Sequence, residues 1–284
     1  MVDFAIDLKN VTKKYDGFML NNVSFTLPRG CIMGLIGANG AGKSTIIKLM
    51  LGIIKKDSGD IKLLGCDSDK LSNEVKERIG VVFDESFFPE NMKLREIERV
   101  LANIYKNWDE TVFARYTSEF GLPQNVAIKD FSRGMKMKLS IACALSHNAE
   151  LLVLDEATSG LDPIVRNEIL DIFLDFIQDE NNSVLISSHI TSDLEKVCDY
   201  VTFIDNGKII MSDEKDLILE KYAVVKCSQD EIDKLPREKT IGIRKNKFGA
   251  EVLTETKAVP ADFIAEPADL EKIMLFTAKK ENRK

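Results

Sequence analysis

The chain has 284 residues, of which 44% are hydrophobic and 30% are charged. This is the composition of an ordinary globular protein, and the length allows one large domain with a smaller second one. The formal net charge of -7 argues against a protein that binds nucleic acid through a clustered basic surface, so we expect no nucleic-acid partner. No apolar run approaches the roughly 18 residues that span a bilayer, and we expect neither a membrane span nor a signal peptide.

The five cysteines are scattered along the chain, and no two of them have Cys-x-x-Cys spacing. Their odd number and their spacing favour neither a disulfide framework nor a zinc site. We therefore expect reduced, mostly buried thiols of a cytosolic protein.

Short apolar segments alternate with helical patterns from residue 4 to about residue 204. Residues 4–8 and 23–27 predict β-strands bounded by turns. Later apolar runs predict strands of a parallel sheet that is buried on both faces. These runs are 31–36, 79–83, 151–154, 184–187 and 201–204, and the helical patterns between them include 45–51, 139–145 and 164–177. The alternation predicts an α/β core.

Residues 91–121 depart from this alternation. Apolar side chains recur there at helical spacing from Leu94 to Tyr105, and Phe113, Tyr116 and Phe120 continue the pattern. The spacing predicts an inserted α-helical subdomain over about residues 88–146.

The composition changes again after about residue 219. Segments 224–227 and 240–244 favour strands, and 267–276 is amphipathic. We expect a small C-terminal α+β accessory domain over 219–284, after a main domain over 1–218. The charged residues 279–284 predict a solvated, frayed tail.

A complete G-x-x-x-x-G-K-[ST] phosphate loop follows the apolar run 31–36. Its residues are Gly37, Ala38, Asn39, Gly40, Ala41, Gly42, Lys43, Ser44 and Thr45. Glycines let the backbone curl around phosphate oxygens, so that N–H groups and the next helix's N-terminus face negative charge. Lys43 can then reach the β- and γ-phosphates, and the Ser44 hydroxyl can hold magnesium. A glycine turn that binds nothing is the alternative, which the flanking segments and the Lys43–Ser44 pair disfavour.

Two carboxylates, Asp155 and Glu156, end the apolar segment 151–154. Asp155 would hold magnesium, and Glu156 would accept a proton from the attacking water or orient it. In isolation, such an acidic pair could equally be a helix cap.

Further motifs follow in a fixed order: Phe-Ser-Arg-Gly-Met at 131–135, Ser-Gly-Leu-Asp at 159–162 and Ser-Ser-His at 187–189. Together with Tyr15, the phosphate loop and the two carboxylates, they make residues 4–215 resemble the nucleotide-binding subunit of an ATP-binding cassette (ABC) transporter. The resemblance implies a P-loop NTPase with a mixed sheet core. It also implies ATP and Mg²⁺ as ligands.

The resemblance implies a role for each motif. Tyr15 stands where an aromatic residue stacks on adenine, and His189 stands where the switch histidine binds the γ-phosphate. Two cassettes would pack head to tail, so that the signature of one closes the ATP site of the other. That signature contains Ser132, Arg133, Gly134 and Met135, and Asp162 belongs to the D-loop. Local structure offers other roles, because Ser132 can cap a helix, Tyr15 can pack at a sheet edge and His189 can be a surface residue.

The sequence departs from the family pattern at three places. Asp84 replaces the usual glutamine after the strand at 79–83; it could still ligate magnesium but cannot donate an amide hydrogen bond. Arg133 and Met135 replace a glycine and a glutamine of the signature. Ala157 replaces a common proline after Glu156, which alters loop stiffness. We interpret Asp84 as a metal-side or coupling residue.

The resemblance implies an ATPase subunit that dimerises on ATP and drives a separate membrane permease, in particular an exporter. The second cassette could be another copy or a paralogue, and the chain would lie in the cytoplasm, at the inner face of the membrane through the permease. Phe87 and Phe88 could contact the permease or belong to the core of the helical subdomain. A soluble ABC ATPase in cofactor assembly or translation is the alternative, and a catalytically silent regulatory cassette is a third reading.

Overall fold

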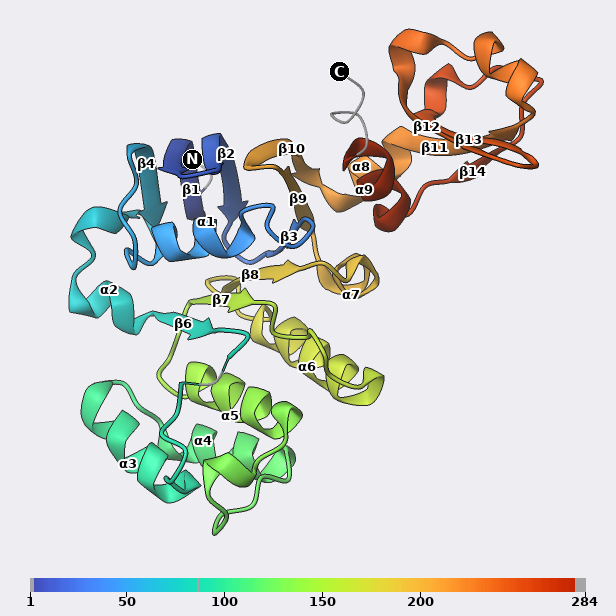
Figure 1. The fold of residues 1–284 in the computed structure, drawn as a ribbon. Coiled ribbons are helices and arrows are strands. Elements are labelled where there is room, and N and C mark those ends of the chain that lie inside the picture. Colours follow the sequence, from blue (N-terminus) through green and yellow to red (C-terminus); the bar gives the residue numbers. More distant parts are fainter. Residues whose placement is uncertain (1–2, 86, 279–284) are drawn as a thin grey trace.

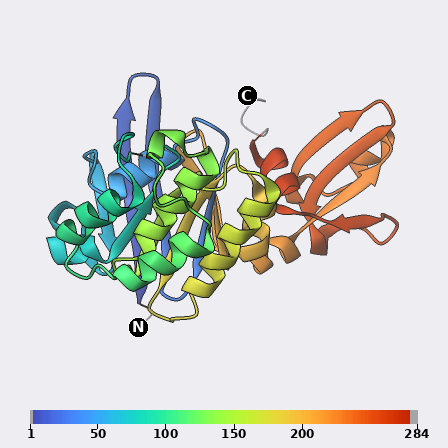
Figure 2. The ribbon, with the colours of Figure 1, turned by 90° about the horizontal axis from the view of Figure 1, so that it is seen from below.

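The structure is a computed structural model that describes residues 3–85 and 87–278 (Figure 1). The frayed tail expected at 279–284 lies outside the described residues. Three sheets organise the described part: an N-terminal and a C-terminal sheet of four strands each and a central sheet of six. The C-terminal sheet lies at one end of the molecule, beside the other two (Figure 2).

The central sheet has the order β10-β9-β3-β8-β7-β6, in which β10 alone is antiparallel to its neighbour. Every residue of β3, β7 and β8 is buried, as expected for parallel strands that are covered on both faces. The carboxyl ends of these strands meet at one edge of the sheet, where the phosphate loop, Glu156 and His189 follow them. The strands are β3 (Ile32–Ile36), β6 (Ile79–Val82), β7 (Leu151–Asp155), β8 (Ser183–Ser188), β9 (Tyr200–Asp205) and β10 (Lys208–Glu214).

The N-terminal sheet is antiparallel and has the order β2-β1-β4-β5. Helix α1 (Lys43–Met50) shares one apolar cluster with this sheet and the central one. Strand β1 continues well beyond the predicted segment 4–8, because its polar second half pairs with β2 and β4 after register shifts. The strands are β1 (Phe4–Tyr15), β2 (Phe18–Pro28), β4 (Ser58–Leu63) and β5 (Cys66–Asp67).

A layer of three helices contains most of the predicted subdomain. Helices α3 (Leu94–Ile104), α4 (Glu110–Glu119) and α5 (Arg133–Leu145) enclose an apolar cluster that includes Leu94, Ile97, Phe113, Phe131 and Leu139. The short α2 (Asn73–Glu77) precedes β6, and α6 (Pro163–Phe176) follows the D-loop. Helix α5 contacts β6, so the signature segment is joined to the central sheet.

The C-terminal sheet has the order β12-β13-β11-β14 and packs against α9 (Leu270–Ala278). The predicted segments 224–227 and 240–244 lie within β11 and β12. The sequence analysis missed β13 and β14. The strands are β11 (Tyr222–Cys227), β12 (Thr240–Asn246), β13 (Gly249–Glu255) and β14 (Ala265–Pro267).

One apolar cluster joins the central sheet to the C-terminal sheet. It runs from Ile186 and Leu194 to Leu253 and Phe276, and α9 contacts α7 (Thr191–Val197). Helix α8 (Lys215–Lys221) crosses the domain boundary that we predict near residue 218. Within the described ranges, none of the helices is long and apolar enough to cross a membrane.

All five cysteines are free thiols, as expected from their spacing. Cys143 and Cys198 are buried, but the other three are half-buried, so the expectation that most of the thiols are buried is wrong. Burial raises the pKa of the Cys143 and Cys198 thiols well above their ordinary value. These two side chains therefore act as small apolar groups of the core.

Candidate nucleotide-binding site

The phosphate loop joins β3 to α1 in a backbone conformation that its glycines allow. Gly42 has φ 115, a left-handed conformation that side chains disfavour, and it caps α1. A Cβ on Gly37 would lie 2.5 Å from the carbonyl oxygen of Ile204 on the neighbouring strand. The sequence folds here into a tight strand-to-helix turn whose helix begins at Lys43. The N-terminus of α1 presents free N–H groups, which favour the binding of an anion.

Lys43 is 5% exposed, and its ammonium group has three oxygen partners. Its Nζ donates to the carbonyl oxygens of Gly37 at 2.7 Å and Ala38 at 3.4 Å. The third partner is Oε1 of Glu156, 3.0 Å from Nζ. A buried ammonium group needs such partners, because removing it from water is costly.

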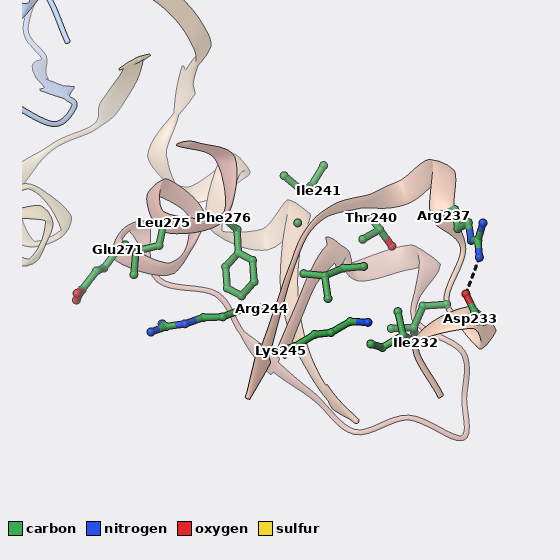
Figure 3. A pocket seen from close by; sticks show the side chains of 13 residues that line it. Ile232, Asp233, Arg237, Thr240, Ile241, Arg244, Lys245, Glu271, Leu275 and Phe276 are labelled. Atoms are coloured by element: carbon green, nitrogen blue, oxygen red, sulfur yellow. Dashed lines mark hydrogen bonds and ion pairs between the residues drawn. The ribbon is translucent and has the colours of Figure 1, made fainter. Parts of the chain in front are cut away.

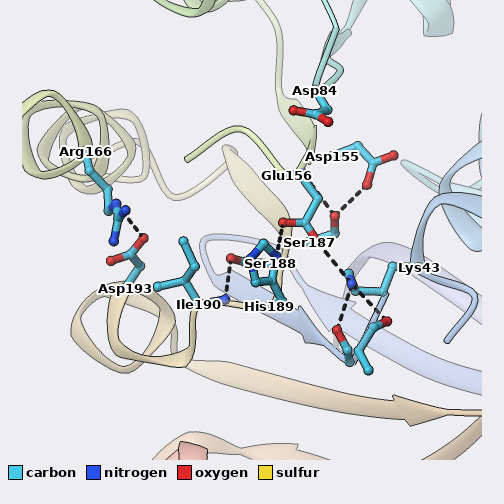
Figure 4. A network of polar contacts seen from close by, with 12 residues as sticks. Lys43, Asp84, Asp155, Glu156, Arg166, Ser187, Ser188, His189, Ile190 and Asp193 are labelled. Atoms are coloured by element: carbon cyan, nitrogen blue, oxygen red, sulfur yellow. Dashed lines mark hydrogen bonds and ion pairs between the residues drawn. The ribbon is translucent and has the colours of Figure 1, made fainter. Parts of the chain in front are cut away.

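Glu156 follows β7 and lies at the centre of the polar network in Figure 4. Its second carboxylate oxygen, Oε2, lies 2.7 Å from Nδ1 of His189. The residue has φ 55, a strained conformation for a side chain with a Cβ, and its N–H donates to the carbonyl and hydroxyl oxygens of Ser187. Strained residues of this kind cluster at active sites. The network joins the phosphate loop, the end of β7 and the end of β8 in one place.

Asp155 is the last residue of β7 and is 6% exposed. The Ser187 hydroxyl donates to its Oδ1 at 2.6 Å. Ser187 thus contacts both the Asp155 carboxylate and the backbone N–H of Glu156. The sequence analysis assigned no role to this serine, although a hydroxyl at the end of a buried apolar strand was a usable signal.

The signature residues begin α5. Ser132 caps this helix, and its Oγ accepts from the N–H of Met135 at 3.2 Å. A Cβ on Gly134 would meet no atom closer than 3.9 Å, so packing within the chain does not require a glycine there. Asp162 caps α6, and its Oδ1 accepts from the N–H groups of Ile164 and Val165.

The departures at Asp84 and Arg133 contact each other. The Arg133 guanidinium donates to the Asp84 carboxylate, which follows β6. The same guanidinium also lies against Gly160, where an added Cβ would be 2.8 Å from its Nη1. Arg133 therefore joins three segments: the signature, the segment after β6 and the D-loop. Spacing along the chain could not predict this contact, because the two partners are 49 positions apart.

Tyr15 ends β1 and is 46% exposed. The ammonium group of Lys13 lies 5.7 Å from the ring centroid. The chain's other histidine, His147, does not contribute to the network: it is buried, stacks on Tyr105 with ring centroids 4.2 Å apart, and its Nδ1 contacts the carbonyl oxygen of Glu77. Burial lowers the pKa of His147 below its ordinary value.

Comparison with known proteins agrees with this arrangement. The family described as ABC transporter matches residues 20–159. The chain is 36% identical to the lantibiotic transport ATP-binding protein SrtF of Streptococcus pyogenes over 213 residues, which are 74% of this chain and 91% of that protein. It is 34% identical over 269 residues to the Nod factor export ATP-binding protein I of Rhizobium leguminosarum bv. viciae, covering 89% of this chain and 82% of that protein.

Among solved structures, an ATP-binding subunit of an ABC transporter superposes with a TM-score of 0.66 at 28% identity, over 75% of this chain and 91% of that one. The predicted α/β fold of a P-loop NTPase is confirmed by this likeness and by the mixed central sheet. The chain therefore belongs to the ABC transporter family, as an ATP-binding subunit with ATP hydrolase activity.

Proposed function

We propose that this chain hydrolyses ATP as one half of a pair of cassettes and thereby drives an exporter whose permease is a separate chain. The observation that carries the proposal is the contact of Glu156 with both Lys43 and His189, which gathers three predicted catalytic residues in one network. The relative named for Nod factor export supports the direction of transport. The chain would lie in the cytoplasm, at the inner face of the membrane through its permease.

The phosphate loop suits a nucleoside triphosphate. Its glycine turn ends at the N-terminus of α1, and the buried Lys43 ammonium group lies beside it. Phosphate oxygens would replace Glu156 as a partner of Lys43 and would leave the carboxylate of Glu156 free. The exposed ring of Tyr15 would stack on adenine. The loop residues from Gly37 to Thr45 would supply the remaining N–H contacts.

The donor set suits magnesium only together with phosphate. Within the described residues, no group of three or more histidine, cysteine, aspartate or glutamate side chains could hold a metal. The Ser44 hydroxyl and the Asp155 carboxylate are hard oxygen ligands of the kind that Mg²⁺ prefers, with water and phosphate oxygens filling its other positions. Asp84 stays a predicted metal-side residue. Its contact with Arg133 would have to break before its carboxylate could ligate magnesium.

Glu156 would be the general base. It accepts a proton from the attacking water, whose oxygen forms the new bond to the γ-phosphorus while the bond to the β-phosphate oxygen breaks and ADP leaves. His189 would bind the γ-phosphate from the end of β8 and respond to its release. Lys43 would balance the charge on the transferred group.

The signature would complete the site of a second cassette, which is a homodimer partner or a paralogue. Ser132 and Gly134 present a hydroxyl and an N–H group at the start of α5, where a helix favours anions. Glycine inside a helix costs about 1 kcal/mol relative to alanine, and nothing in this chain's own packing requires it at Gly134. Close approach of a phosphate would explain the glycine. Arg133 and Met135 flank it, and Asp162 would lie at the same interface through the D-loop.

Exposed apolar side chains near the helical layer suit contact with the permease. Phe87 is 76% exposed, and α3 exposes Val100 and Ile104 one turn apart. Phe88 packs into the cluster of the helical layer instead. The two phenylalanines therefore have different roles: Phe87 would contact the permease and Phe88 stabilises the subdomain.

The test is capture of the permease from the native membrane. Tagged chain should co-purify with a multi-helix integral membrane protein, and Phe87→Asp should abolish this association. Ile264→Asp is the matched control, because Ile264 is also exposed but lies next to the C-terminal sheet. Capture of soluble partners alone would contradict the proposal and favour cofactor assembly or translation.

A further inference from the structure

A cleft of about 980 Å³ follows the edge of the C-terminal sheet, remote in sequence from every ATP-site motif. Figure 3 shows its walls: strand β12 crosses the middle, the 3-10 helices at Gln229–Lys234 and Arg237–Lys239 lie on one side, and α9 lies on the other. The proposed ATPase function uses none of these residues.

The cleft contains a free strand edge. Strand β12 is the end strand of its sheet and, among the described residues, pairs only with β13. In an antiparallel pair, alternate residues turn their N–H and C=O groups away from the partner strand. An unpaired edge of this kind is a template for another strand.

Apolar side chains line both sides of this edge. Ile243 packs with Leu235 on the side of the 3-10 helices. On the other side Phe276 lies directly against Gly242, where an added Cβ would be 3.1 Å from its ring. The glycine lets α9 approach the strand closely. An added strand would therefore enter a groove with apolar walls, one from each side.

The charges in the cleft are mostly positive, although the whole chain carries -7. Arg244 and Lys245 are exposed and point away from the strand in opposite directions (Figure 3). Within residues 3–85 and 87–278, neither side chain has an ion pair or a side-chain hydrogen bond. Asp233 is neutralised by Arg237, 2.6 Å away, which leaves Glu271 as the remaining acidic group of the lining. The edge therefore presents one cation without an ion pair on each face of the sheet, although Glu251 of β13 is the register partner of Arg244.

We propose that the β12 edge binds an extended segment of a partner protein by strand addition, with adjacent acidic side chains opposite Arg244 and Lys245 and apolar ones beside Ile243 and Phe276. Backbone hydrogen bonds would hold the segment, and cross-strand charge pairs would select it. A second copy of this chain is a poor occupant of the edge. Pairing two β12 strands would bring four positively charged side chains together on adjacent strands, where like charges repel.

The probe is a fluorescent, capped nine-residue peptide of valine and threonine with two adjacent glutamates at its centre, titrated with the full chain by anisotropy. The double variant Arg244→Glu, Lys245→Glu should bind the two-glutamate peptide about tenfold or more weakly than the wild-type chain does. It should bind the matching two-lysine peptide better than the two-glutamate peptide. Lys129→Glu combined with Lys257→Glu makes the same change in net charge on exposed residues elsewhere and should leave binding unchanged.

A second peptide tests the strand geometry. Methylation of alternate backbone nitrogens removes the donors that a strand needs, so this peptide should not bind. Three outcomes would each overturn the proposal. The methylated peptide could bind as well as the unmethylated one, no peptide could bind at all, or the two double variants could weaken binding equally. Sedimentation showing that Arg244→Glu with Lys245→Glu changes the oligomeric state without ATP would assign the edge to a second copy instead. ATP hydrolysis by the variant serves as the check that it is folded.

Discussion

Replacing Glu156 by glutamine tests the polar network at its centre. The amide keeps the shape of the side chain but loses the negative charge and the ability to accept a proton from water. A general base contributes about 10²- to 10⁴-fold to a rate. We therefore expect Glu156→Gln to slow ATP hydrolysis by that factor, which corresponds to about 2.7–5.5 kcal/mol of activation free energy.

The same variant should bind ATP more tightly. In the structure Glu156 holds the Lys43 ammonium group at 3.0 Å, and this contact has to break before Lys43 can bind phosphate. A contact with a charged group is worth about 1.5–3 kcal/mol, and the glutamine amide, which still faces the Lys43 cation but carries no negative charge, would lie at the low end of this range. The difference of about 1 kcal/mol predicts roughly fivefold tighter binding of ATP.

Two measurements check these effects: steady-state phosphate release, and equilibrium binding of a non-hydrolysable ATP analogue to the purified chain. Glu220→Gln is the matched control, because Glu220 is exposed on α8 and should leave both measurements unchanged. Hydrolysis by Glu156→Gln within tenfold of the wild-type rate, or weaker binding of the analogue, would refute the reasoning.

Three further predictions concern residues around this network. Gly134→Ala should raise or preserve the free energy of unfolding of the isolated chain. It should reduce ATP-dependent dimerisation and hydrolysis. If the variant lost its activity because it was less stable than wild type, this prediction would be contradicted. Asp84→Asn and Arg133→Gln, made singly and together, should show a coupling free energy of about 0.2–1 kcal/mol in urea unfolding, because both side chains are about half exposed. Strictly additive effects would show that the contact contributes nothing to stability. Burial holds the pKa of His147 below its ordinary value of 6.5, so the unfolded chain binds the extra proton at a higher pH than the folded chain does. The free energy of unfolding should therefore fall as the pH drops below about 6.5. His147→Gln should flatten this part of the stability–pH profile relative to wild type.

Local patterns in the sequence were sufficient to locate candidate site segments that consist of consecutive residues. The phosphate loop and the Asp155–Glu156 pair were located from local patterns, because a glycine turn and a strand ending in carboxylates have strong local signals. The convergence of Lys43, Glu156 and His189 was implied by family resemblance, and the parallel order of β3, β8 and β7 explains it physically.

Contacts between distant segments could not be predicted. Asp84 and Arg133 looked like two separate departures from a family pattern, and only the packing of α5 against β6 brings them together. The second half of β1 was missed for a related reason: Lys9, Asn10 and Thr12 form no apolar alternation, and their strand conformation depends on pairing with β2 and β4. The free edge of β12 likewise follows from strand order, which no local pattern encodes.

The packing of α7 against α9 gives the two ends of the molecule a common mechanical element. Helix α7 starts two residues after His189, and α9 forms one wall of the β12 cleft. Any shift of α7 that accompanies release of the γ-phosphate would move that wall. Thermodynamic linkage then requires reciprocity: the factor by which ATP changes the affinity of the cleft for its occupant equals the factor by which the occupant changes the affinity for ATP. A protein bound at the far end of the chain would thereby set the ATP concentration at which the cassette closes.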